Sequence, residues 1–300
     1  MQALLILLSI AVLVMALPAQ AALKIFATVP EWGALASELG GDKVNVYTAT
    51  GPLQDPHHVE AKPSLIARAR SADLVIATGA ELEIGWLPLV LQQAGNPAIR
   101  PGRPGYFEAA QQVQLLEMPT RLDRAEGDVH AAGNPHIQTD PRNIARVADA
   151  LARRLAELDP ANASWYQSRY ADFDTRWKAA IARWTQQAAA LRGVTILVHH
   201  KAFVYLENWL GLKEVGALEP KPGIEPTSAH LAGVLDIARQ QPVKMVIRAA
   251  YQDGRASDWV AGRANIASVP LPFTVGGTPG AKDLFGLFDD TVQRLLAGLK

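Results

Sequence analysis

Histidine is the residue whose type and spacing could do metal chemistry in this chain. The sequence has seven histidines and no cysteine, so any metal ion must be held by nitrogen and oxygen atoms. His57 and His136 lie in predicted loops beside strand or helix ends, and His200 lies at the end of a predicted strand over 193–198. Three neutral imidazoles converging from separate elements are typical of zinc, with a fourth position for a carboxylate or water.

The other four histidines have simpler interpretations. His58 and His199 each adjoin one of the three favoured residues. Because consecutive residues in a loop or strand point in different directions, one of each pair should face away, and the neighbour is the alternative ligand. His130 lies in the polar segment 117–133, which we interpret as a mobile loop, and is expected to be solvated, with weak metal collection as the alternative. His230 begins a predicted helix and is expected to be exposed.

A single long helix is predicted over 160–191, between the histidine-bearing segments that precede and follow it in the chain. Its bulky apolar residues recur at three- and four-residue spacing, which places them on one stripe of a helix roughly 45 Å long. No Gly or Pro interrupts it after Pro160. A helix of this length is better explained as a rigid strut between two lobes than as part of one lobe, and its stripe predicts packing. The stripe consists of Tyr166, Tyr170, Phe173, Trp177, Ile181, Trp184 and Leu191.

The segments on both sides of this helix predict α/β lobes. Near-continuous apolar runs that alternate with helices indicate parallel strands buried on both faces. We expect an α/β fold of two lobes with parallel sheets, joined by one rigid backbone helix, with the metal site at the lobe interface. The predicted parts are a leader over 1–22, an N-terminal lobe over 23–159, the linking helix over 160–192 and a C-terminal lobe over 193–300.

Composition excludes several classes of protein. A chain of 300 residues with 49% hydrophobic content suits two domains of ordinary size. The formal net charge is zero and no basic stripe stands out, which argues against a nucleic-acid-binding protein. The lack of cysteine excludes disulfides and predicts that the chain is not a lipoprotein.

The first residues have the pattern of an export signal. Met1–Leu17 is almost wholly apolar, and Ala19-Gln20-Ala21 has the small-residue spacing of a signal-peptidase site. We expect cleavage near Ala21. An uncleaved membrane anchor is the alternative, since the apolar run is just short of the ~20 residues needed to span a bilayer.

Five motifs that occur in a fixed order carry a family resemblance. Together they resemble the substrate-binding proteins of zinc and manganese ATP-binding-cassette (ABC) importers, closest to the periplasmic zinc-type members, over nearly all the chain after the leader. The motifs are Asp55-Pro56-His57, Gly79-Ala80-Glu81-Leu82-Glu83 with Trp86, Asn134-Pro135-His136-Ile137 with Asp140-Pro141, His200-x-Ala202-Phe203-x-Tyr205, and Glu225-Pro226-Thr227.

The resemblance implies a function and a ligand set. The histidines of the three histidine motifs bind the metal in that family, which corresponds to His57, His136 and His200 here. It also implies a periplasmic, non-enzymatic protein that captures Zn²⁺, with Mn²⁺ less favoured, and delivers it to an ABC permease in the inner membrane. We expect a monomer without catalytic residues.

Two positions depart from the family pattern. Members usually supply a fourth ligand, an Asp, from a loop near the carboxyl end, but the comparable stretch 271–277 has no carboxylate. The fourth ligand is therefore expected to be water, Asp283 or Glu60. The strand near 246–249 usually ends in Glu, and here it has Arg248 and Ala249, so substrate handling should differ from the family norm.

Two other functions use the same residues. Three imidazoles and an open water position also suit a zinc hydrolase or hydratase, because zinc lowers the pKa of bound water to ~7. However, the chain has no His-Glu-x-x-His motif, and Glu81 and Glu83 are expected to cap or support a helix that begins near Trp86. A metal-stapled adhesin is the other alternative. The sequence therefore predicts metal transport first.

Overall fold

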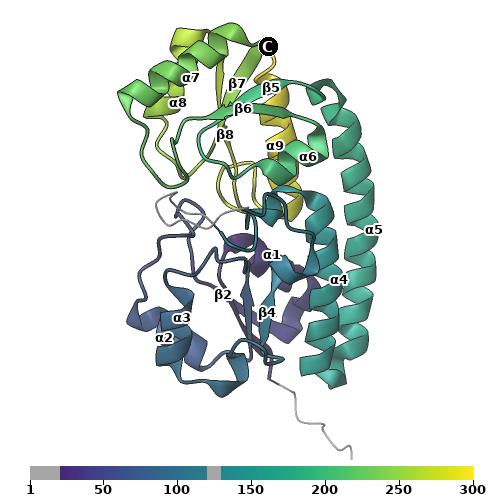
Figure 1. Cartoon of the computed structure of the whole chain (residues 1–300). Helices are drawn as coiled ribbons and strands as arrows, with labels where there is room; N and C mark the ends of the chain where they lie inside the picture. Colours follow the sequence, from purple (N-terminus) through teal and green to yellow (C-terminus); the bar gives the residue numbers. More distant parts are fainter. Residues whose placement is uncertain (1–20, 120–129) are drawn as a thin grey trace, which may run out of the picture.

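Two parallel sheets form the centres of two lobes in the computed structural model, which describes residues 21–119 and 130–300. The N-terminal sheet has strand order β2-β1-β3-β4, and the C-terminal sheet has strand order β6-β5-β7-β8 (Figure 1). The expected α/β architecture with parallel sheets is confirmed. Most of the predicted leader and the segment 120–129 of the predicted mobile loop lie outside the described residues. Within the described part, no helix is long and apolar enough to cross a membrane.

The N-terminal lobe forms because short apolar strands alternate with helices that begin at proline. β3 is buried at all four positions, as expected for a central parallel strand. Pro30, Pro63 and Pro141 each open a helix, where a missing N–H costs nothing. The elements are β1 (Leu23–Ala27), α1 (Pro30–Gly40), β2 (Val44–Thr48), α2 (Pro63–Arg70), β3 (Leu74–Ala77), α3 (Leu87–Ala94), β4 (Tyr106–Glu108) and α4 (Pro141–Leu158).

The C-terminal lobe repeats the alternation after the long helix. Side-chain caps fix two of its helices: Thr227 accepts a hydrogen bond from the His230 N–H at the start of α7, and Asp283 accepts one from the Gly286 N–H at the start of α9. The elements are β5 (Thr195–Val198), α6 (Val204–Leu210), β6 (Lys213–Ala217), α7 (Ser228–Gln240), β7 (Val243–Ala249), α8 (Arg255–Ala264), β8 (Ala267–Leu271) and α9 (Leu284–Ala297).

The long helix α5 (Ala163–Gln187) runs along one side of both lobes (Figure 1). A 3₁₀ turn precedes it at 160–162 and another follows at 188–191, so the helical path covers the predicted range. It packs on α1 and α4 of the N-terminal lobe and on α9 of the C-terminal lobe. Its buried face includes Phe173, Trp177 and Trp184, which belong to one apolar cluster shared by both lobes. The predicted packing role of the stripe is confirmed.

Candidate metal centre

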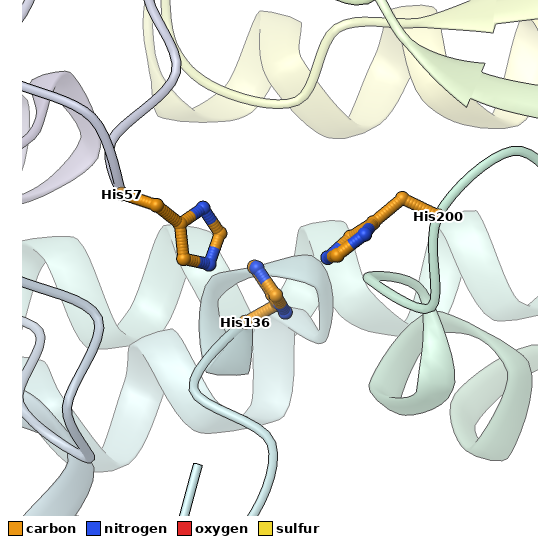
Figure 2. Close-up of side chains that lie close together, drawn as sticks. All are labelled: His57, His136 and His200. Carbon is orange, nitrogen blue, oxygen red and sulfur yellow. The ribbon is translucent and has the colours of Figure 1, made fainter. Parts of the chain in front are cut away.

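Three histidines from separate segments converge between the lobes. Figure 2 shows the rings of His57, His136 and His200 pointing into one space. Each offers a ring nitrogen, and these nitrogens lie within 4.8 Å of one another. Nitrogens that share one tetrahedral zinc ion lie about 3.3 Å apart, since each bond is about 2.0–2.1 Å long. Small side-chain movements would therefore bring all three onto a common ion.

The fold delivers each histidine at the end of an element. His57 lies in the loop between β2 and α2, His136 precedes the 3₁₀ turn that leads into α4, and His200 follows the carboxyl end of β5. Open α/β sheets place ligands at such strand ends. The Tyr205 hydroxyl donates to the Asn134 carbonyl at 2.6 Å, so α6 of the C-terminal lobe holds the segment that carries His136.

A hydrogen bond fixes the orientation and tautomer of each ring. Because carboxylate and amide oxygens only accept, each Nδ1 carries the proton and each Nε2 keeps a free lone pair. The Nε2 atoms of His57 and His136 are buried and have no hydrogen-bond partner, which buried polar atoms rarely lack. The Nδ1 atoms donate from His57 to Asp55 at 2.8 Å, from His136 to Asn134 at 2.8 Å and from His200 to Glu219 at 2.6 Å.

The electrostatics of the site favour the protonation states that metal binding needs. Burial, followed by the neighbouring imidazoles, lowers the pKa of His136 well below its ordinary 6.5. Burial alone would raise the pKa of Asp55, but the hydrogen bonds that it accepts from His57, together with the charge that this ring carries when protonated, hold the pKa well below its ordinary range. At neutral pH the His136 imidazole is therefore neutral and the Asp55 carboxyl is ionised, which leaves Nε2 ready to bind a cation.

The neighbouring histidines face elsewhere. His58 is exposed, and its Nδ1 lies 3.3 Å from Oδ2 of Asp55. His199 is buried, but its Nδ1 lies 3.2 Å from the Ser257 hydroxyl of α8. His230 is not exposed as predicted: it is half-buried, and its Nε2 lies 3.0 Å from the Ala217 carbonyl. The loop that leads into α7 turns this ring back onto β6.

Neither carboxylate that was expected as a fourth ligand lies at the histidines. Asp283 is exposed and caps α9, and Glu60 is exposed near Lys62 at 3.8 Å. Both carboxylates therefore interact with neighbours in the sequence. Among the described residues, the cluster of potential metal ligands consists of the three histidines alone.

His130 lies beside the three histidines, where the sequence predicted a solvated side chain, with weak metal collection as the alternative. Its ring stacks on His57 with centroids 5.4 Å apart and lies 6.3 Å from the ring of His136. Its Nε2 is buried without a hydrogen-bond partner. Burial, together with His57 and His200, lowers the pKa of His130 to about 4, so the imidazole is neutral at physiological pH. The expectation of a solvated side chain was wrong, because residues distant in sequence hold this segment against the site.

Thr274 occupies the stretch in which a fourth-ligand Asp was expected. Its hydroxyl donates to Glu31 of α1, which joins the two lobes beneath the histidines. The adjacent Phe273 packs against His136 with ring centroids 5.5 Å apart. In this chain the stretch supplies an interlobe hydrogen bond and an apolar wall.

Replacing Glu31 with Gln should flatten the pH dependence of stability. Burial raises the pKa of Glu31 from 4.5 to about 7, so folding keeps a proton that the unfolded chain loses above pH 4.5. The contribution of this bound proton to the free energy of unfolding is fully present below pH 4.5 and is lost as the pH rises through about 7. Between pH 4.5 and 8 the wild type should lose about 3 kcal/mol more unfolding free energy than Glu31→Gln, by the ~1.4 kcal/mol per pKa unit of linkage. Urea unfolding of the metal-free protein measures this.

The exposed variant Glu60→Gln is the control for that experiment and should follow the wild-type curve. Parallel pH profiles for wild type and Glu31→Gln would contradict the raised pKa of Glu31.

Comparisons with known proteins place the chain in a family. The family model "Zinc-uptake complex component A periplasmic" matches residues 25–298. The high-affinity zinc uptake system protein ZnuA of Bacillus subtilis (strain 168) is 23% identical over 263 residues, which are 86% of this chain and 81% of that protein. The manganese ABC transporter substrate-binding lipoprotein PsaA of Streptococcus anginosus is 23% identical over 259 residues, 84% of this chain and 80% of that protein.

Solved structures show the same fold. A crystal structure of ZnuA superposes with a TM-score of 0.77 at 24% identity, covering 93% of this chain and 100% of that one. A mutant structure of the laminin-binding adhesin Lmb from Streptococcus agalactiae superposes with a TM-score of 0.75 at 21% identity, covering 93% of this chain and 100% of that one. With the family model matching nearly the whole described chain, this protein belongs to the periplasmic zinc-uptake component A family, the metal-binding components of ABC importers.

Proposed function

We propose that Zn²⁺ is the cargo that this protein captures outside the cytoplasm and delivers to an ABC permease. The observation that carries the choice of metal is the donor set: His57, His136 and His200 present nitrogen atoms within 4.8 Å of one another. Imidazole nitrogens suit zinc, whereas manganese prefers carboxylate and water oxygens. Relatives of both kinds resemble this chain, so the donor atoms are what favours zinc.

We propose His130 as the fourth ligand. Its buried Nε2 has no other partner, and its ring stacks on that of His57. A backbone hydrogen bond supports its place, because the Ala131 N–H donates to the Glu81 carboxylate. The nitrogens of His130 lie outside the group of three, so its ring would move toward them on binding, and four imidazoles would then complete the tetrahedral coordination that zinc adopts in closed sites. Release to a permease would then begin with withdrawal of the His130 segment, since hydrogen bonds to Asp55, Asn134 and Glu219 hold the other three rings.

Calorimetric titration of the metal-stripped protein with Zn²⁺ and Mn²⁺ tests this proposal. We expect zinc to bind at least 100-fold more tightly than manganese. His130→Ala should weaken zinc binding about tenfold or more, while His58→Ala should leave it unchanged. Equal affinity for the two metals would overturn the choice of zinc, and unchanged zinc affinity in His130→Ala would remove His130 from the ligand set.

Glu219→Ala should weaken zinc binding by about 10- to 100-fold, the effect typical of losing the hydrogen-bond partner of a ligand histidine. Glu219 accepts the His200 Nδ1 proton at 2.6 Å and so fixes which nitrogen faces the ion. Glu225→Ala removes an exposed carboxylate nearby and is the matched control. Titration of both variants checks this, and equal losses would point to general electrostatic attraction rather than ring positioning.

Release into the periplasm without a lipid anchor stays a prediction. It rests on the lack of cysteine, while one relative is named a lipoprotein. Fractionation of expressing cells, with the protein recovered in the periplasmic extract and not in membranes, is the expected result.

A further inference from the structure

A cavity of about 660 Å³ lies in the N-terminal lobe, away from the histidines. It opens where β3 and β4 end, and none of the three histidines of the metal centre lines it. In open α/β sheets the carboxyl ends of parallel strands are where ligands bind. The volume falls within the range of small-molecule sites, about 300–1,000 Å³.

The cavity is apolar along one wall and charged at its edges. Ile84, Leu87 and Leu91 form the apolar wall, and Ile84 is 66% exposed. Arg100 also lines the cavity, and its guanidinium makes no hydrogen bond or ion pair with any described residue. Glu81 lines the same space. A large exposed apolar side chain beside an unpaired cation is more typical of a binding site than of a solvated surface.

The backbone at the mouth of the cavity is held in an unusual conformation. Ala80 and Glu81 both have positive φ, 47° and 67°. Residues other than glycine adopt this region at a cost of order 1–3 kcal/mol each, and they do so mainly at functional sites. The conformation directs Glu81 toward Ala131, whose N–H donates to one carboxylate oxygen, Oε2. No described residue bonds to the other oxygen, Oε1, so it is free to accept from a ligand.

We propose that this cavity binds a small zwitterion with an apolar side chain, of the chemical class of the hydrophobic α-amino acids. The Arg100 guanidinium would pair with the ligand carboxylate, Glu81 with its ammonium group, and the wall of Ile84, Leu87 and Leu91 with its side chain. A simple organic anion is disfavoured because Glu81 and Glu108 both line the cavity and would repel it. The site lies outside metal transport and needs no bound metal.

Glu81 connects this cavity to the metal centre. A ligand ammonium on Glu81 Oε1 would fix the carboxylate whose Oε2 holds Ala131, the residue after His130. A fixed Glu81 would hold Ala131, and with it the neighbouring His130, in the position from which His130 reaches the ion. Bound amino acid should therefore tighten zinc binding several-fold. This consequence rests on the proposed role of His130, whereas binding to the cavity does not.

Calorimetry of the metal-free protein with L-leucine and L-phenylalanine tests the site itself. For ligands of this size we expect a dissociation constant on the order of 10 μM. N-acetyl-leucine lacks the ammonium and leucine amide lacks the carboxylate, so each should bind at least tenfold more weakly. Arg100→Gln should weaken L-leucine binding at least tenfold. Arg103→Gln alters an exposed arginine three residues away that does not line the cavity, and this control should leave L-leucine binding unchanged.

Absence of binding by either amino acid at millimolar concentration would overturn the proposal, and so would wild-type affinity in Arg100→Gln. Zinc titration with saturating L-leucine then tests the connection. A several-fold tighter zinc affinity in the wild type that is absent in Arg100→Gln supports the connection. Unchanged zinc affinity overturns the link through Glu81. The cavity itself is then decided by the calorimetry of the metal-free protein alone.

Discussion

His136→Ala should weaken zinc binding by about two to three orders of magnitude. Zinc held by four protein ligands gains about 10–16 kcal/mol of apparent binding free energy, so one ligand accounts for about 3–4 kcal/mol, at a factor of ten per ~1.4 kcal/mol. His136 is the most enclosed of the three, 1% exposed, and its Nε2 has no other partner. Water can replace the lost imidazole only in part. Competition with a chromophoric chelator, starting from metal-stripped protein, measures the change.

His58→Ala is the matched control for that experiment. His58 is also a histidine of the cleft, but it is exposed and lies outside the cluster of converging nitrogens. Its replacement should leave zinc affinity within a factor of two or so. Equal losses in the two variants would mean that ions are collected by histidines in general and not by the buried cluster. The thermal midpoint of each metal-free variant separates lost ligands from lost folding.

The architecture could be predicted because local patterns and the fold agree. The β3 sequence Leu-Val-Ile-Ala is apolar throughout, and a strand buried on both faces of a parallel sheet requires that. The stripe on α5 has a helical period because one side of the helix faces the lobes. β4 escaped prediction because its three residues, Tyr106–Glu108, are too few to show a period. Only its pairing with β3 makes it a strand.

Two of the three converging histidines lie close in sequence to the residue that orients them, whereas His200 was predicted from its position at a strand end, since its partner Glu219 is 19 residues away. Asp55 lies two residues before His57, and Asn134 lies two before His136, so each motif contains both the ligand and the group that orients it. His130 lacks such a partner. The contact that holds its segment joins Ala131 to Glu81, fifty residues earlier, and no local pattern reports a contact of that separation.

The role of the Glu83 side chain was also wrongly predicted, for a related reason. The backbone carbonyl of Glu83 supports the start of α3, where it accepts from the Leu87 N–H, but its carboxylate does not cap that helix and instead accepts hydrogen bonds from the Thr28 hydroxyl and from the N–H groups of Thr78 and Gly79. These groups lie at the carboxyl ends of β1 and β3, which are neighbours only in the folded sheet. Burial raises the pKa of Glu83. Its carboxylate therefore ties together the segments that follow β1 and β3.

Several contacts between the lobes limit how the site can open. Thr274 bonds to Glu31, Tyr205 bonds to Asn134, and α5 is packed against both lobes. A wide hinge motion would break these hydrogen bonds together, and each contributes about 0.5–1.5 kcal/mol relative to water. These contacts oppose separation of the lobes, in line with the proposed release by local movement.

Trp177→Ala should lower the free energy of unfolding by about 3–5 kcal/mol, the cost of truncating a fully buried tryptophan. Trp177 is 0% exposed and lies where α5 passes from one lobe to the other. Its indole N–H donates to the Pro141 carbonyl at the start of α4, and its ring contacts Phe285 and Phe288 of α9 at centroid distances of 4.9 and 5.6 Å. The substitution removes contacts to both lobes at once. The shift of the urea midpoint measures its effect.

Trp165→Ala, on the same helix, is the control that isolates burial from residue type. Trp165 is 38% exposed, although its indole N–H also donates to a carbonyl, that of Gly40. It should cost about 1 kcal/mol, mostly for the hydrogen bond. If the two variants lost the same stability, α5 would be a helix attached to the surface. A larger loss for Trp177 alone would mean that the helix joins the two lobes through a shared core, which keeps His57 and His136 in register with His200.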